Sequence, residues 1–132
     1  MPVGQATVRK NVLPPIPVPA YFELSASLDA STDAITAHSG GGQASAVALT
    51  TPLNRVTVCA ADHDSVKLPA AKAGMKVSVI NSTAHILDVY ATGTETINAI
   101  AASSPLSVGA ALVTELKCPV DGKWFSFPAV VS

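Results

Sequence analysis

The segment KVSVIN at residues 76–81, followed by ILDVYA at residues 86–91, decides the fold class of this chain. Successive side chains of a β-strand point to opposite faces, so Val77, Val79 and Asn81 share one face of the first segment. Leu87 and Val89 share a face of the second segment, together with Ala91. Short alternating segments rich in β-branched residues are typical of strands that bury one face.

Segments of this kind follow one another from Gln43 onward, and each ends at Gly, Pro, Asn or Asp. This pattern predicts an all-β fold, an antiparallel β-sandwich or barrel. Asp121-Gly122 lies between two apolar segments and predicts a hairpin with a type I′ turn. No repeat of about 20 to 50 residues is visible, which argues against a solenoid or a propeller. The expected strands cover residues 21–28, 45–50, 55–60, 65–68, 76–81, 86–91, 95–100, 112–118 and 123–127.

The 132 residues suit one domain, which we expect at residues 43–132. Residues 21–42 are interpreted as one strand and a loop that ends in the glycine run 40–42, a possible boundary before the domain. Residues 1–20 hold five prolines and predict an extended arm without internal hydrogen bonds.

The arm carries apolar side chains between its prolines, and these side chains are better buried on a partner than left in water. An unordered chain end or an expression remnant is the alternative interpretation of this region. The residues expected to contact a partner are Val12, Leu13, Pro14, Pro15, Ile16, Pro17, Val18 and Pro19.

The composition favours self-association and excludes several partners. Charged residues are 13% of the chain, about half of the roughly 25% usual in soluble domains, and 48% are hydrophobic. Many of the apolar residues are alanines, but the low charge still predicts an oligomer. The net charge is −1, with the charges scattered singly, which argues against binding to nucleic acid or to anionic lipid.

The sequence shows no signal-peptide pattern and no apolar run of the ~20 residues that a membrane helix needs. We therefore expect a soluble protein without a membrane partner. Cys59 and Cys118 are the only cysteines, and in a reducing cytoplasm they are expected as free, buried thiols. An immunoglobulin arrangement is disfavoured because Trp124 follows both cysteines.

No pattern of residues indicates catalysis, so we expect no enzyme, no cofactor and no metal. The densest polar cluster is Asp62-His63-Asp64-Ser65, which is interpreted as a solvated turn, with a divalent cation site as the alternative. His38 and His85 lack a second His or Cys at zinc-ligand spacing. Nucleophile-elbow, phosphate-loop and dinucleotide-binding patterns are absent from the sequence.

The stretch Asp64 to Ala71, followed by Gly74, Val77, Val79 and Asn81, resembles a β module that recurs in virion proteins of tailed bacteriophages. The resemblance covers roughly residues 55 to 127. It departs from the module at Thr94, where Asp commonly follows the Gly, and at Ala91, where Pro is frequent. The pattern continues in the same order through Val89-Tyr90, Gly93, Ile97-Asn98, Gly109, Cys118 and Gly122-Lys123-Trp124.

Modules of this kind occur in capsid decoration proteins, head fibres and tail-tip proteins, so the resemblance implies a structural virion protein. The expected function is that of a capsid cement or decoration protein that stabilises a phage head as a homotrimer. Its expected partners are further copies of itself and the major capsid protein. It would be assembled in the cytoplasm of the bacterial host and would lie on the capsid surface.

A tail or head-fibre module that recognises a host-surface glycan is the alternative. Glycan recognition favours exposed aromatic rings, yet aromatic residues are only 5% of the chain, which favours the cement function. The aromatic residues expected in an oligomer interface or in the core are Tyr21, Phe22, Tyr90, Trp124, Phe125 and Phe127.

Overall fold

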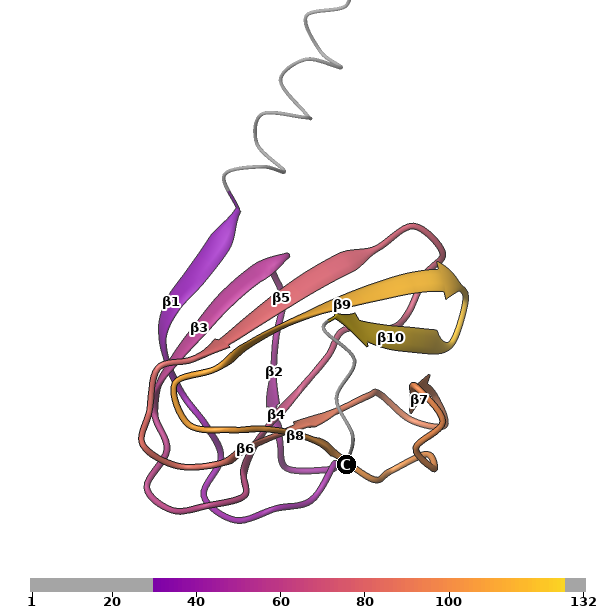
Figure 1. The fold of residues 1–132 in the computed structure, drawn as a ribbon. Coiled ribbons are helices and arrows are strands. Elements are labelled where there is room, and N and C mark those ends of the chain that lie inside the picture. The colour runs from indigo at the N-terminus through magenta and orange to yellow at the C-terminus, as the bar shows by residue number, and fades with distance from the viewer. Residues whose placement is uncertain (1–29, 128–132) are drawn as a thin grey trace, which may run out of the picture. The chain divides into compact units, whose positions relative to one another are not determined.

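Ten β-strands form the regular structure of residues 30–127, the part of the chain that a computed structural model describes (Figure 1). The all-β prediction is confirmed. The arm at residues 1–20 and the expected strand at 21–28 lie outside the described residues. The strands are β1 (Ser31–Thr36), β2 (Val47–Ala48), β3 (Leu53–Val58), β4 (Asp64–Lys67), β5 (Lys76–Asn81), β6 (Leu87–Tyr90), β7 (Thr96–Ile97), β8 (Leu106–Val108), β9 (Val113–Val120) and β10 (Lys123–Phe127).

The strands belong to two sheets, and the chain crosses repeatedly from one to the other. Sheet A has six strands in the order β1-β3-β5-β9-β10-β7, and sheet B has four in the order β2-β4-β6-β8. Odd-numbered strands therefore lie in sheet A and even-numbered strands in sheet B as far as β9, and β10 returns to sheet A. Side chains from both sheets meet in a single hydrophobic core.

The first six strands form three coils that stack through parallel pairing. β1 pairs with β3 and β3 with β5 in sheet A, while β2 pairs with β4 and β4 with β6 in sheet B. Leu53 pairs with Ser78, 25 positions later, and Val66 pairs with Val89, 23 positions later. The fold is thus a short β-solenoid, and the prediction of an antiparallel sandwich or barrel is wrong for these strands.

Antiparallel strands close the last coil. β9 pairs with β5, β8 pairs with β6, and β10 folds back on β9, while the short β7 lies parallel to β10. The hairpin expected at Asp121-Gly122 is confirmed. Only Gly122 of the two has a positive φ, at 85°, so the turn is not of type I′, which needs positive φ at both central residues.

All eight expected strands inside the described region overlap observed strands, and residues 76–81 and 123–127 match β5 and β10 in both bounds. The segments 45–50 and 95–100 each shorten to two residues, those of β2 and β7. Strands β1 and β8 were missed. β1 buries only Ile35 and has Ala34 at a φ of 57°, so it shows no clear alternation, and β8 alternates over only three residues, which is too short a signal.

The inner face of sheet B carries the clearest trace of the repeat. Val47, Val66 and Val89 pair in register across β2, β4 and β6. Two residues further along each strand the core receives Leu49, Leu68 or Ala91. The fully buried Trp124 of β10 packs into the same core from sheet A.

A fully buried asparagine fastens the end of β5 to the loops around it. The Asn81 side-chain amide donates to the carbonyl oxygens of His85, Val108 and Gly109, at 2.8, 3.0 and 3.0 Å. Its Oδ1 accepts from the backbone N–H and the hydroxyl of Thr83, at 3.1 and 2.8 Å. One side chain therefore satisfies polar groups that the loops around coil three would otherwise bury without partners.

The glycine run belongs to the β unit, which begins with β1 and not at Gln43. Gly40 N donates to the carboxylate of Asp64 at 2.9 Å, and Gly42 N donates to the hydroxyl of Tyr90 at 3.0 Å. A Cβ at Gly41 would lie 3.4 Å from the same hydroxyl, so the loop approaches sheet B closely. Residues 40–43 thus form a cover over the part of the outer face of sheet B that holds Ser65 and Tyr90.

We predict that Asn81→Ala destabilises the fold by about 3 kcal/mol, because it leaves three carbonyl oxygens and the Thr83 N–H without their partner. Urea unfolding followed by circular dichroism measures this loss. The control is Ser82→Ala at the exposed neighbouring position, which should change stability by less than about 0.5 kcal/mol. Equal stability of the two variants would contradict the role given to Asn81.

Candidate interaction surface

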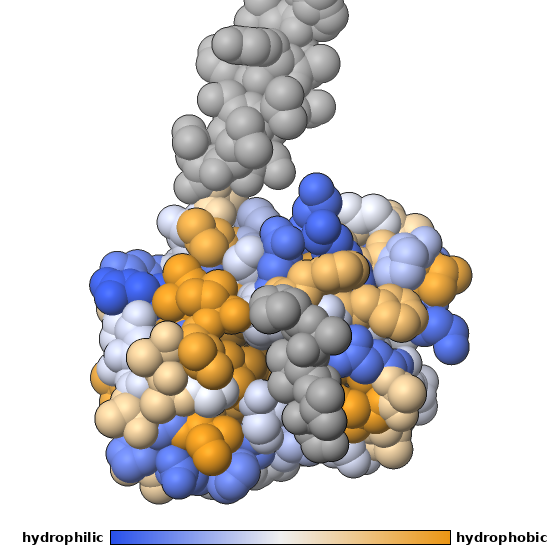
Figure 2. Space-filling view, in the orientation of Figure 1, coloured by the Kyte–Doolittle hydropathy of each residue, from blue (hydrophilic) through white to orange (hydrophobic). Residues whose placement is uncertain are grey.

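The outer face of sheet A is the apolar surface of the described region. Six of the seven large hydrophobic side chains that are exposed there belong to β3, β9 and β10, and the seventh, Leu112, directly precedes β9. None belongs to sheet B. Figure 2, in the orientation of Figure 1, shows apolar residues over the strands of sheet A. The seven are Leu53, Val58, Leu112, Val113, Val120, Phe125 and Phe127.

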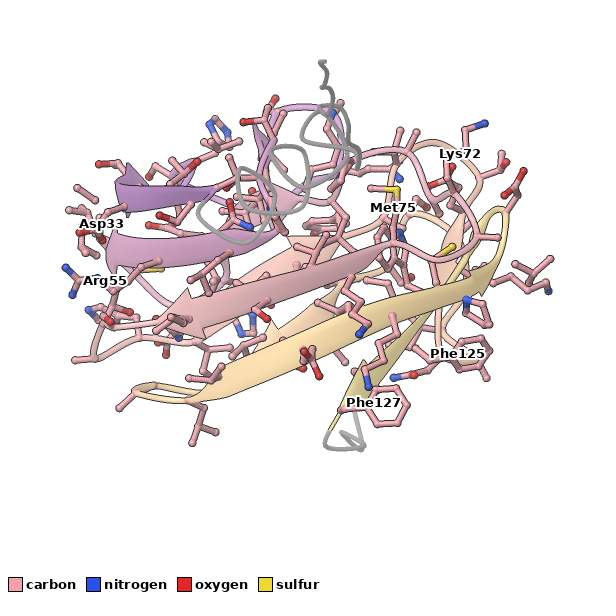
Figure 3. The ribbon with its side chains drawn as sticks, turned by 90° about the horizontal axis from the view of Figure 1, so that it is seen from above. Asp33, Arg55, Lys72, Met75, Phe125 and Phe127 are labelled. Carbon is pink, nitrogen blue, oxygen red and sulfur yellow. The ribbon has the colours of Figure 1, made fainter. Side chains whose placement is uncertain are left out.

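The last strand presents aromatic rings on both of its faces. Trp124 is completely buried in the core, whereas Phe125 and Phe127 are 39% and 48% exposed on the outer face. Both phenylalanine rings project outward from β10 (Figure 3). The register places Phe125 beside Lys117 and Phe127 beside Glu115 of β9. The Lys117 ammonium lies 4.8 Å from the centre of the Phe127 ring, within cation–π range.

Several charged groups of this face pair with one another. Arg55 donates two hydrogen bonds to Asp33, at 2.6 and 3.0 Å, in a fork that Figure 3 shows at one side of the sheet. The Arg55 hydrogen bond holds the pKa of Asp33 below its usual range, and the same bond raises the pKa of Arg55. Lys117 lies 3.8 Å from Glu115. Such exposed pairs add little stability. The two charges of each pair have opposite signs and therefore offset each other on this face.

The cluster Asp62-His63-Asp64-Ser65 is not a solvated turn, as the sequence suggested, because Asp64 and Ser65 are buried. The Asp64 carboxylate accepts hydrogen bonds from the backbone N–H groups of Gly40 (2.9 Å), Ala60 (2.7 Å) and Ala61 (3.3 Å). These bonds, that of Gly40 first, lower the pKa of Asp64. The carboxylate therefore fastens the first coil to the second.

Two histidines pair with carboxylates across coils two and three. His63 Nδ1 lies 3.1 Å from Asp88 Oδ1, and His85 Nδ1 lies 3.2 Å from Asp62 Oδ1. Asp88 is nearly buried and also accepts from the Ser107 hydroxyl at 2.9 Å. Within residues 30–127 no three His, Cys, Asp or Glu side chains converge to hold a metal ion.

Both cysteines are buried and unpaired in the structure. The Cys118 thiol donates to the carbonyl oxygen of Val120 at 3.1 Å, and burial raises the pKa of Cys59. The raised pKa disfavours the reactive thiolate form of Cys59.

Of the remaining aromatic candidates, the structure describes only Tyr90, which does not belong to the exposed face. Tyr90 is buried beneath the glycine cover, while Tyr21, Phe22 and the arm lie outside the described residues. Sequence reasoning missed Leu53 and Val113, because exposed and buried apolar positions differ only in the direction of the side chain. The outward spacing of Phe125 and Phe127 relative to Trp124 was the signal that located this face.

Comparisons with known proteins supply no relative. No protein family, no curated protein and no solved structure matches the chain. In the described part of the chain, no helix is long and apolar enough to cross a membrane.

We predict that Cys59 and Cys118 are free thiols. Alkylation of the denatured protein without reductant should add two labels, whereas the folded protein should react slowly because both thiols are buried. A denatured mass two protons lighter with no label would show a disulfide instead.

We predict that part of the stability depends on protonated His63. The hydrogen bond to Asp88 raises the pKa of His63 above its ordinary value of about 6.5, so protonation favours the folded state. This contribution is complete below that ordinary value and is lost as the pH rises through the raised pKa. The urea midpoint should therefore be higher at pH 5.5 than at pH 8.

The variant His63→Gln should reduce this difference between the two pH values, and the control His38→Gln should retain it. An unchanged pH dependence in His63→Gln would contradict the assignment.

Proposed function

We propose that this chain is a structural virion protein, a capsid cement or decoration protein that stabilises the head of a tailed bacteriophage as a homotrimer. The observation that carries the proposal is the apolar outer face of sheet A on a body whose other sheet is covered by its own loop. Apolar faces of this kind serve assembly in most soluble proteins. The site of action is the capsid surface, after assembly in the host cytoplasm.

The residues that carry the resemblance to virion modules support this proposal through their structural roles. Gly74, Gly93 and Gly122 all have positive φ, where side-chain-bearing residues are strained. Asn81 fastens the loops and Trp124 fills the core. The residues of the shared pattern that the structure describes thus shape the turns, loops and core of the β unit.

The arm is proposed as the anchor on the major capsid protein. Burial of Val12, Leu13, Ile16 and Val18 would contribute several kcal/mol at about 25 cal/mol per Å², less the cost of ordering the segment. The prolines lower that cost because they already restrict the free chain. Attachment through an arm leaves the outer face of sheet A available for other contacts.

A fibre or tail module that binds a host-surface glycan is the second candidate. Phe125 and Phe127 favour it, since two exposed rings beside Lys117 and Glu115 could stack on a sugar and bind its hydroxyls. The burial of Trp124 and Tyr90 argues against this second candidate, because these rings cannot contact a ligand at the surface.

We predict that deletion of residues 1–20 leaves a folded oligomer that binds capsids lacking this protein far more weakly than the full chain does. Co-sedimentation with such capsids measures binding, and circular dichroism verifies the fold. Equal decoration by the truncated and full chains would show that the β body carries the attachment. Retention on a glycan array together with no binding to capsids would favour the second candidate.

A further inference from the structure

We infer that the turn at residues 60–63 is a pH-dependent latch, which is closed onto coil three while His63 is protonated and opens when His63 loses its proton. Opening is local: it exposes Cys59 while the strands on either side of the turn stay paired. The latch belongs to the β unit alone and therefore goes beyond the proposed function.

The latch turn is held by polar contacts alone. Residues 60–63 connect β3 to β4, all four are exposed, and none contributes a side chain to the core. Two backbone bonds join the turn to coil three: His63 N donates to Ile86 O at 2.8 Å, and Ile86 N donates to Asp62 Oδ1 at 3.0 Å. The same Asp62 oxygen lies 3.2 Å from His85 Nδ1. Segments without buried apolar contacts are the first to open in a folded protein.

The backbone of His63 is strained in the closed turn. Its φ is 72°, a left-handed conformation that is uncommon for residues with a side chain. Such strain persists only where the surroundings hold the residue in place. Here the backbone N–H bonds to Ile86 and the imidazole bonds to Asp88, both in coil three. The strain therefore favours opening as soon as these bonds weaken.

Asp88 depends on His63 for its counter-charge. The Asp88 carboxylate is buried, accepts from the Ser107 hydroxyl at 2.9 Å and lies 3.1 and 3.2 Å from His63 Nδ1. Within residues 30–127 it receives no backbone N–H bond and has no other cationic side chain within 4.0 Å, whereas Asp64 accepts from three N–H groups. A buried carboxylate without a counter-charge is costly. Loss of the His63 proton therefore favours an open corner in which water reaches Asp88.

The other charges of the corner act in the same direction. Its carboxylates outnumber its imidazoles, so a neutral His63 leaves them with less compensation. The titratable groups around His63 are Asp62 and Asp64 from coil two, His85 and Asp88 from coil three, Cys59 before the turn, and His38 from coil one.

The sign of the pH dependence follows from the closed geometry. The hydrogen bond to Asp88, and then the charges of Asp88 and Asp62, raise the pKa of His63. Opening removes these contacts and returns the pKa of His63 to its ordinary value of about 6.5. The latch is therefore strongest below that value and weakens as the pH rises through the raised pKa.

Cys59 reports on the latch. It directly precedes the turn and is buried. Burial raises the pKa of its thiol, and the charges of Asp64, Asp62 and Asp88 raise it further, so the thiol lies beside this corner. Opening of residues 60–63 thus exposes a thiol that the closed latch protects.

The test is the rate at which N-ethylmaleimide labels Cys59 in the full chain at pH 5.5 and pH 8, measured by mass spectrometry of its peptides. Each rate is divided by that of the unfolded chain at the same pH, so that the thiolate fraction cancels. This ratio should be about threefold higher at pH 8, as expected for a partly exposed ion pair. It should change little in low concentrations of urea, because local opening exposes little surface.

Four variants assign the effect. His63→Gln should give the higher ratio at both pH values. Asp88→Asn retains a hydrogen-bond acceptor but removes the buried charge, so it should lose the pH dependence. The matched controls His38→Gln and His85→Gln each remove another imidazole, from coil one and coil three, and should retain it.

Equal ratios at pH 5.5 and pH 8 in the full chain would overturn the inference. A pH dependence that survives in His63→Gln or Asp88→Asn, or that is lost in either control, would do the same. If the ratio rises with urea as steeply as global unfolding does, Cys59 is exposed by unfolding of the whole β unit, and the local latch is wrong.

Discussion

Main-chain pairing between successive coils is the constraint on which the rest of this structure depends. Each coil contributes one strand to sheet A and one to sheet B, and each strand needs a neighbour to satisfy its backbone groups. This pairing aligns Val47, Val66 and Val89 into one ladder and brings Asp64 to Gly40. The antiparallel strands β8 and β9 then complete the last coil, so that its backbone groups are also paired.

The sequence predicted the strands better than their arrangement. Alternation in KVSVIN identifies β5 to the residue, because burial of one face determines the residue type at every second position. Alternation does not report strand direction, so the parallel pairing was missed. The repeat was not recognised because the distance in sequence between paired residues varies, from 25 positions in sheet A to 23 in sheet B. Paired positions also hold different residue types, as with Val56 and Asn81. The available signal was the pattern Val-x-Leu at the ends of β2 and β4, with Val-x-Ala at the end of β6, in which the last residue directly follows the strand.

The candidate surface was predicted only in part. The sequence singled out Phe125 and Phe127, but not Leu53 or Val113, since the outer and inner faces of a strand are distinguished only once its neighbours are known. The contacts of the glycine run also could not be predicted from the sequence, because its partners Asp64 and Tyr90 lie far along the chain. It lies against the outer face of sheet B, where Gly42 N donates to the Tyr90 hydroxyl and Gly41 approaches the same oxygen. The polar cluster around Asp64 proved to be part of the fold, where the sequence had suggested a solvated turn.

The proposed function is a claim about a virus particle, and such a particle can be imaged. The most direct measurement is electron microscopy of the virions proposed to carry this chain. The account predicts density for the chain at regular threefold positions over the whole shell. Density confined to the tail would contradict it.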